Sequence, residues 1–346
     1  MISGRFVLRR GGIAKRMNGR ERLLKALRGE ETDRPAVFCA NSTATEQQAE
    51  RFGLRWPAFH QKAEEMVKMA MGAHELFGFD GVRLPFCQTM EAEALGCEVF
   101  YRDFIPSNDV AIYRLEDSPR YPDDFLKRAR IPELLEGMRR LKGEAKGEVL
   151  VIGGISGPLT IARALLDSVP LLKASLKTPE RILPFLQVGE RASLELAKAL
   201  VDAGAEVLVI EDMTASPDLL HPRTYRTAVW EYHRRLVEAI PVPCVLHICG
   251  NVTLIAEEMA RSGASGLSID PKANLKTMRE KVGPGMRLIG GIETLALSLS
   301  NPQEIKNMAF RALREGIDIL APGCAIPPNS PSENIKAMVE AAREYV

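Results

Sequence analysis

The sequence predicts a single (β/α)8 TIM barrel, with an N-terminal helical extension and a rim insertion after its second strand. Short apolar runs alternate with longer amphipathic stretches along the chain, which is typical of repeated βα units. The runs are almost continuously apolar, as parallel strands buried on both faces are. The 346 residues, of which 46% are hydrophobic and 26% charged, suit one large α/β barrel.

A helix is predicted directly after Met17. Asn18 occupies the N-cap position, Glu21 stands three residues later as in a capping box, and Gly29 ends the helix. The apolar face of this helix is formed by Leu23, Leu24 and Leu27. We expect this face to pack under or across a mouth of the barrel.

Eight strands follow in the order that eight βα units require. They are predicted over residues 35–39, 78–85, 148–154, 206–212, 243–249, 266–270, 287–291 and 318–322. The stretches between them have helical periodicity and a glycine near the end, as in 190–204 and 301–316. Several strands end in a polar residue or glycine, and the carboxyl ends of barrel strands carry the active site.

Two segments fall outside this repeat. Residues 91–140 are rich in proline and charge and predict a long insertion that forms a lid or rim layer. Residues 1–16 contain five basic and no acidic residues but lack the apolar core of a secretory signal. We interpret them as an optional, disordered basic tail, with an organellar presequence as the alternative, and residues 17–346 as one barrel domain.

Charge and cysteine content exclude several classes of partner. The net charge is +1, so no bulk field attracts a nucleic acid or an anionic membrane. No apolar run approaches the roughly 18 residues of a membrane span. Six cysteines are too sparse for a disulfide framework, which favours a reducing cytoplasm.

The strongest local motif is VLHICG, which predicts a metal site. His247 and Cys249 are two residues apart near the end of the fifth predicted strand, so both side chains face the same side. Cys324 follows the last strand 75 residues later, and closure of the barrel brings it to the same rim. One histidine and two cysteines are a usual ligand set for Zn²⁺, and three protein ligands leave a position open for catalysis.

Two thiolates make the metal electron-rich, which favours activation of a substrate thiol over zinc-hydroxide chemistry. A fourth, displaceable ligand would complete the site, and Asp270 at the end of the sixth strand is our candidate. Glu211 and Asp212 at the end of the fourth strand are competitors. The alternative for Asp212 is that it caps the following loop or orients the ring of His247.

Several segments resemble the methylcobamide:coenzyme M methyltransferases of the uroporphyrinogen decarboxylase superfamily. They are residues 43–99, 155–162, 212–222, 245–250 and 323–338, and the resemblance covers about 17–346. It implies a (β/α)8 barrel that transfers a methyl group from a corrinoid cobalt to the thiol of coenzyme M, a step of methanogenesis. It also places the zinc ligands on His247, Cys249 and Cys324.

The resemblance implies an external methyl donor. The chain contains no D-x-H-x-x-G cobalamin-binding stretch, so we expect a separate methylated corrinoid protein, or free methylcobalamin, to supply the methyl group. A small-molecule thiol is the second partner. Where superfamily members often carry a G-N turn, this chain has Gly290, Gly291 and Glu293, so the acceptor pocket is expected to differ.

Other residues receive weaker assignments. Glu91 and Glu93 follow the second strand and are candidates to shape the thiol pocket, with solvated caps as the alternative. Gly157 begins a tight turn at the rim. Histidines outside the motif are interpreted as surface or helix residues, and the remaining cysteines as small buried hydrophobes: His60, His74, His221, His233, Cys39, Cys87, Cys97 and Cys244. Cys39 and Cys87 lie near strand ends and are spare candidates for metal ligands.

Three alternative functions can be compared with the sequence. The first is a related corrinoid methyltransferase with another acceptor, such as tetrahydrofolate. A uroporphyrinogen decarboxylase is disfavoured because residues 40–48 contain no arginine where those enzymes carry an arginine-rich stretch. A non-catalytic zinc- or corrinoid-binding protein is disfavoured because a purely structural zinc site is closed by four protein ligands.

Overall fold

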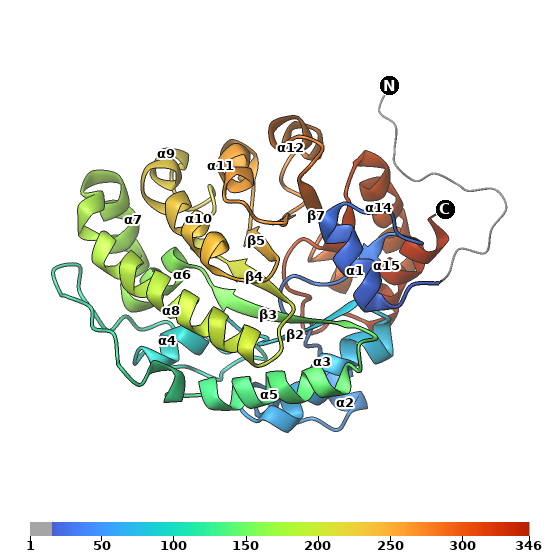
Figure 1. Ribbon diagram of the computed structural model, residues 1–346, viewed down its shortest axis with the longest axis horizontal. Helices are drawn as coiled ribbons and strands as arrows, with labels where there is room; N and C mark the ends of the chain where they lie inside the picture. The colour runs from blue at the N-terminus through green and yellow to red at the C-terminus, as the bar shows by residue number, and fades with distance from the viewer. Residues whose placement is uncertain (1–15, 346) are drawn as a thin grey trace.

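The computed structural model describes residues 16–345, and within them the predicted barrel is confirmed. Eight parallel strands wrap around a central axis in the order β1-β8-β7-β6-β5-β4-β3-β2, with helices on the outside (Figure 1). The strands are β1 (Ala36–Val37), β2 (Gly81–Leu84), β3 (Leu150–Ser156), β4 (Val207–Glu211), β5 (Cys244–Ile248), β6 (Gly266–Ile269), β7 (Arg287–Ile292) and β8 (Ile319–Pro322). All eight predicted strands are present.

The helices between the strands form the outer layer. Their bounds are α1 (Gly19–Arg28), α2 (Glu46–Arg51), α3 (Ala63–Phe77), α4 (Met90–Ala94), α5 (Ile131–Glu144), α6 (Pro158–Leu165), α7 (Ser168–Lys177), α8 (Leu183–Asp202), α9 (Pro222–Thr224), α10 (Trp230–Ala239), α11 (Ala256–Arg261), α12 (Leu275–Val282), α13 (Ala296–Leu299), α14 (Pro302–Glu315) and α15 (Ser332–Glu344). Short helical turns lie at Ala58–His60 (η1) and Phe125–Lys127 (η2).

β1 and β2 share no hydrogen-bond ladder, and Asp80 joins them to close the barrel. The Asp80 N–H donates to the Val37 carbonyl at 2.8 Å, and Asp80 Oδ2 accepts from the Val37 N–H at 2.8 Å. Arg22 and Arg34 both pair with the same carboxylate. The Asp80 carboxylate therefore replaces the missing strand pairing.

Helix α1 lies beneath the barrel, at the amino ends of the strands. Leu23, Ala26 and Leu27 pack against the inward-facing residues of the strands, such as Ile152 and Val209. The N-cap is confirmed, since Asn18 Oδ1 accepts from the Glu21 N–H at 2.9 Å. The reciprocal half of the predicted capping box is wrong, because the side chain of Glu21 pairs with Lys25 instead.

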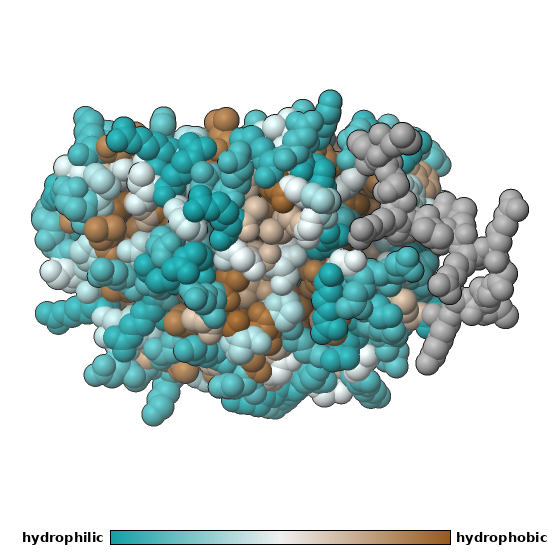
Figure 2. All heavy atoms as spheres, turned by 45° about the horizontal axis from the view of Figure 1, so that its top comes forward, coloured by the Kyte–Doolittle hydropathy of each residue, from teal (hydrophilic) through white to brown (hydrophobic). Residues whose placement is uncertain are grey.

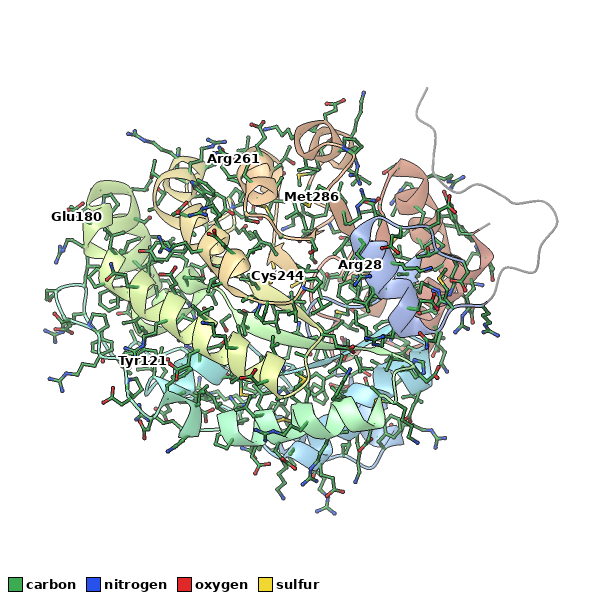
Figure 3. The ribbon with its side chains drawn as sticks, in the orientation of Figure 1. Arg28, Tyr121, Glu180, Cys244, Arg261 and Met286 are labelled. Carbon is green, nitrogen blue, oxygen red and sulfur yellow. The ribbon has the colours of Figure 1, made fainter. Side chains whose placement is uncertain are left out.

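The insertion after the second strand is shorter than predicted. Residues 131–140 belong to α5, an ordinary barrel helix that packs on α3. The inserted loop is therefore 95–130, and it packs against α6 and α8. Tyr121, labelled in Figure 3, donates to Glu195 of α8 at 2.8 Å, and Tyr113 forms a bridge with Leu166.

The exterior is predominantly hydrophilic, with smaller hydrophobic patches on the face shown in Figure 2. Among residues 16–345, no helix combines the length and hydropathy that a membrane span requires. The prediction of a basic tail at 1–16 falls outside the described residues, apart from Arg16.

Candidate metal centre

A layer of polar side chains lies inside the barrel, near the carboxyl ends of the strands. On β4, Val207 and Val209 face inward, so alternation places Glu211 inward as well. The same alternation on β5 places His247 inward, two residues after Val245. His247 is paired in register with Glu211 on β4 and with Ser268 on β6, so these polar residues lie at one level.

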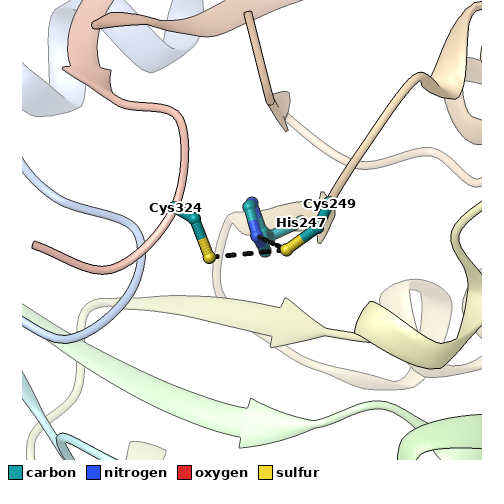
Figure 4. Close-up of side chains that lie close together, drawn as sticks. All are labelled: His247, Cys249 and Cys324. Carbon is teal, nitrogen blue, oxygen red and sulfur yellow. Dashed lines mark hydrogen bonds between the residues drawn. The ribbon is translucent and has the colours of Figure 1, made fainter. Parts of the chain in front are cut away.

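The predicted metal ligands converge above this layer. His247 Nε2 lies 3.1 Å from Cys249 Sγ, and Cys249 Sγ lies 3.4 Å from Cys324 Sγ (Figure 4). The ligand atoms of the three residues are all within 4.8 Å of one another. His247 is fully buried, whereas both cysteines are half-buried. The end of β5 and the loop after β8 thus supply one cluster, as the sequence predicted.

A glycine allows Cys324 to reach the cluster. A Cβ atom at Gly323 would lie 2.4 Å from Cδ of Pro271 and 3.3 Å from Cα of Asp270. Only glycine therefore lets the loop after β8 pass this close to the end of β6. Any side chain at position 323 would push the Cys324 sulfur away from His247 and Cys249.

The cluster fits a zinc ion. Bond lengths of about 2.3 Å to sulfur and about 2.0 Å to nitrogen place tetrahedral ligand atoms about 3.5–3.8 Å apart. The observed separations of 3.1 and 3.4 Å are slightly shorter, so a small outward movement of the side chains would accommodate the ion. The donor set of one imidazole and two thiols is also one that Zn²⁺ prefers.

Without a metal, hydrogen bonds among the two thiols and the imidazole shift their pKa values. The pKa of Cys324 falls to about 5, because the Cys249 thiol donates a hydrogen bond to it and His247 lies beside it. The bond to the Cys324 thiolate, together with burial, raises the pKa of Cys249. Burial alone would lower the pKa of His247, but the hydrogen bond to Cys324 and the negative charges of Cys324 and Glu211 together outweigh burial and raise this pKa. One sulfur is thus already anionic at neutral pH.

Ser268 holds the imidazole from the far side. Its hydroxyl lies 2.9 Å from His247 Nδ1, and the serine is fully buried on β6. An Nδ1–H that donates to this hydroxyl leaves the Nε2 lone pair directed at the sulfurs, which is the tautomer that a metal needs. The sequence interpretation missed Ser268, although it lies two residues before Asp270 on the same strand face.

Replacement of Ser268 by alanine is expected to weaken zinc affinity by about 10–100-fold, because the ring loses its orienting hydrogen bond. Competition with a chromophoric chelator measures this change. Ser193→Ala removes an equally buried hydroxyl from α8, away from the cluster, and is the matched control. Equal zinc affinities for Ser268→Ala and Ser193→Ala would contradict the role assigned to Ser268.

A buried ion pair supports the site from below. Arg83 of β2 donates to Glu211 and to the Ala40 carbonyl. Glu211 Oε2 also accepts from Asn41 Nδ2 at 2.8 Å and from Gln88 Nε2 at 2.6 Å. The side chains of Arg83 and Glu211 are only 2% and 4% exposed, so this pair is shielded from water.

The space for Arg83 comes from a glycine on the neighbouring strand. A Cβ atom at Gly154 of β3 would overlap the Arg83 guanidinium and lie 2.9 Å from Glu211 Oε1. Glycine at this inward position therefore lets the guanidinium cross the barrel to Glu211. The charge of Arg83 is thus paired inside the barrel and is not free to bind an anionic group of a substrate.

Asp270 lies beside the cluster at the end of β6. Its negative charge contributes to the raised pKa of Cys249. It is not one of the three residues whose ligand atoms lie within 4.8 Å of one another. Its Oδ1 accepts from the Lys272 N–H at 2.9 Å.

Asp212 binds the start of α6 and a buried histidine. Its Oδ1 accepts from the N–H and hydroxyl of Thr160, each at 2.8 Å, and its Oδ2 accepts from the Leu159 N–H at 3.1 Å. Oδ2 also lies 2.8 Å from Nε2 of His233, whose Nδ1 contacts the Tyr225 hydroxyl. His233 lies on helix α10, which agrees with its assignment as a surface or helix residue, but its side chain is buried in this network.

Glu91 and Glu93 belong to a second buried polar group at the start of α4. Glu91 accepts from the N–H and hydroxyl of Ser156 at 2.7 and 2.9 Å, and burial raises its pKa to about 7. Glu93 pairs with Arg130 at 2.6 Å. Of the two alternatives for His60, a surface or a helix residue, the surface one is wrong, because His60 ends the helical turn η1 and is 2% exposed, with its carbonyl accepting from Arg130.

The cysteines outside the metal cluster are free and buried, as predicted. Cys39 lies closest to the site, since its thiol is 3.6 Å from the Cys324 carbonyl. Burial raises its pKa to about 12, which keeps this sulfur protonated. Cys39 therefore packs behind the Cys324 loop as a neutral thiol.

The chain was compared with known proteins. The model of the uroporphyrinogen decarboxylase (URO-D) family matches residues 18–345. The methylcobamide:CoM methyltransferase MtaA of Methanosarcina barkeri is 38% identical over 329 residues, which are 94% of this chain and 97% of that protein. The methylcobamide:CoM methyltransferase MtbA of Methanosarcina acetivorans is 32% identical over 334 residues, or 94% and 98%.

A solved structure gives the same result for the fold. The structure described as "methyltransferase from Methanosarcina mazei" is 36% identical, with a TM-score of 0.91 over 95% of this chain and 99% of that one. Sequence and fold therefore agree over the whole described barrel. This chain belongs to the uroporphyrinogen decarboxylase (URO-D) family.

Proposed function

We propose that this protein is a methyltransferase that moves a methyl group from a methylated corrinoid to the thiol of coenzyme M, with zinc as the activating metal. The observation that carries this proposal is the convergence of His247, Cys249 and Cys324 at the carboxyl rim of the barrel. Relatives named methylcobamide:CoM methyltransferases, which match over nearly their whole length, support the same reaction.

The three ligands would hold the metal, and neighbouring residues fix their positions. A zinc ion on His247, Cys249 and Cys324 would lower the pKa of an incoming thiol, so that the thiol reacts as a thiolate at neutral pH. Ser268 fixes the orientation of the imidazole, and the loop at Gly323 fixes the position of the Cys324 sulfur. We infer that the carboxylate of Asp270 is the displaceable fourth ligand that yields to the substrate thiol.

Residues around the metal cluster control the charge of the site. Glu211 lies at the level of His247 on the neighbouring strand and pairs with Arg83, so this ion pair adds no net charge beside the ligands. The two cysteine thiolates would then balance the double charge of a bound zinc ion. An incoming thiolate attacks the methyl carbon, the cobalt–carbon bond breaks, and the electron pair of that bond remains on the corrinoid.

We propose that the methyl donor is external to the described barrel. Residues 17–345 contribute to one barrel, and the printed sequence contains no D-x-H-x-x-G stretch. We propose that a separate methylated corrinoid protein docks over the carboxyl rim, where the metal ligands lie. Six free cysteines fit a reducing compartment, so we propose that the reaction takes place in the cytoplasm.

The test is a methyl-transfer assay with zinc-loaded protein, methylcobalamin and coenzyme M, followed at the cobalt absorption band. We expect methylcobalamin to be demethylated in proportion to coenzyme M methylated, while homocysteine and tetrahydrofolate remain unmethylated. Demethylation with one of these two but not with coenzyme M would replace the proposed acceptor. Release of carbon dioxide from uroporphyrinogen without methyl transfer would overturn the proposed reaction.

A further inference from the structure

A second sulfur-centred cluster lies at the carboxyl end of β2, apart from the metal ligands. Cys87 follows β2 and is 7% exposed. The Thr89 hydroxyl donates to its sulfur at 3.3 Å, and Arg130 Nη1 donates to it at 3.6 Å. Arg130 Nη2 also donates to the Thr89 hydroxyl at 2.7 Å, so the three groups form a closed hydrogen-bonded set.

The direction of these hydrogen bonds distinguishes Cys87 from the other buried cysteines. The thiols of Cys39, Cys97 and Cys244 each donate to a backbone carbonyl, at 3.4–3.6 Å. Cys87 instead accepts from a cation and a hydroxyl. A neutral thiol is only a weak acceptor, whereas an anionic sulfur is stabilised by donors and by a nearby positive charge.

His60 provides an independent indication of a site. It is 2% exposed, and neither of its ring nitrogens forms a hydrogen bond of normal geometry with any described residue. His60 is also among the groups that lower the pKa of Cys87. A buried imidazole without a partner costs free energy unless a ligand or a charged group interacts with it.

Titratable groups from η1, α4, α5 and the inserted loop surround Cys87, and the last of these contributes Tyr101, whose ring lies 5.6 Å from the Arg130 guanidinium. Burial would raise the pKa of Cys87, but Arg130 at the start of α5 and His60 of η1 outweigh it and lower this pKa to about 6. Two carboxylates of α4 act in the opposite sense. Glu93 forms an ion pair with Arg130 at 2.6 Å, which offsets part of the positive charge near Cys87. The Cys87 sulfur contributes to the raised pKa of Glu91.

We propose that Cys87 is a second reactive sulfur and a modification site, at which a small peroxide oxidises it to a sulfenic acid while Arg130 and His60 bind the sulfur. The sulfur attacks one peroxide oxygen, so that a sulfur–oxygen bond forms and the oxygen–oxygen bond breaks. Hydroxide leaves with the electron pair of that bond and takes a proton from solvent. The sulfur loses two electrons and the peroxide gains them.

The ionisation of Cys87 can be measured without any reagent reaching it. The ultraviolet absorbance of the thiolate is followed against pH in zinc-loaded wild-type protein and in Cys87→Ser, and the difference is taken. We expect a titration centred near pH 6, which follows from the lowered pKa. Cys97→Ser is the matched control, and its difference titration should lie far above neutral, since burial raises the pKa of Cys97 to about 11.

The reaction is tested by brief exposure to hydrogen peroxide, trapping with dimedone and mass spectrometry of each cysteine peptide. We expect Cys87 to be labelled at neutral pH while Cys97 and Cys244 are not. Arg130→Gln should move the titration towards the ordinary cysteine value of about 8.5 and slow labelling, whereas Arg130→Lys should retain most of both. If Arg130→Gln does not fold, His60→Gln serves as the second variant.

Two results would overturn the proposal. One is a Cys87 titration at or above the ordinary cysteine value in the folded wild-type protein. The other is an absence of dimedone adduct on Cys87 under conditions that label an exposed cysteine peptide. Neither measurement depends on methyl transfer, so failure of this proposal is distinguishable from failure of the proposed function.

Discussion

Replacement of Cys324 by alanine is expected to abolish stoichiometric zinc binding and to reduce methyl transfer by about 1000-fold or more. An unactivated thiol with a pKa of about 8.5 is only about 3% ionised at pH 7, so loss of ionisation alone costs about 30-fold. The metal also positions the thiol for attack, and loss of this positioning accounts for the rest of the decrease in activity. Metal analysis of the purified variant and the methylcobalamin assay measure the two effects.

Cys244→Ala is the matched control for this prediction. Cys244 is a buried cysteine at the start of β5, the strand that carries His247, but it is not part of the metal cluster. We expect this variant to retain zinc and most activity. A Cys324→Ala protein that keeps both full zinc content and full activity would show that the cluster is not the catalytic centre.

Replacement of Glu211 by glutamine is expected to lower the free energy of unfolding by about 3–5 kcal/mol. The substitution keeps the shape of the side chain but removes the charge that pairs with Arg83, and it leaves a guanidinium buried without a counterion. Urea denaturation of zinc-loaded protein, followed by circular dichroism, measures the difference from the wild type.

The double variant Arg83→Met with Glu211→Gln tests the cause of this loss. If the unpaired charge is responsible, removal of both charges should recover most of the lost stability. A double variant as unstable as the sum of its two single variants would contradict this explanation. The ion pair would then contribute through its hydrogen bonds to Asn41 and Gln88 instead.

The strands and the metal ligands were predictable because local patterns determine them. Apolar runs of strand length marked all eight strands, and the two-residue spacing of His247 and Cys249 placed both on one face of β5. Closure of the barrel then left only one rim for Cys324. The predicted far end of the insertion is wrong, because Pro132 lies in the first turn of α5, where proline is favoured, and does not mark a loop.

The polar groups behind the ligands were less predictable, because their partners are distant in the sequence. Arg83 and Glu211 are 128 residues apart, and His233 meets Asp212 across a loop and a helix. The burial of His60 was not predictable, because it has no partner at a regular spacing in the sequence. For Glu211 and Ser268 a signal did exist, since both occupy inward-facing positions of buried strands, where a polar residue needs a partner.

X-ray absorption spectroscopy at the zinc edge, with and without coenzyme M, tests the central claim most directly. We expect one zinc per chain with two sulfur neighbours at about 2.3 Å and one nitrogen at about 2.0 Å, and a third sulfur when coenzyme M is added. Absence of bound zinc, or a sulfur count that does not change on addition of the thiol, would contradict activation of the thiol by this metal centre.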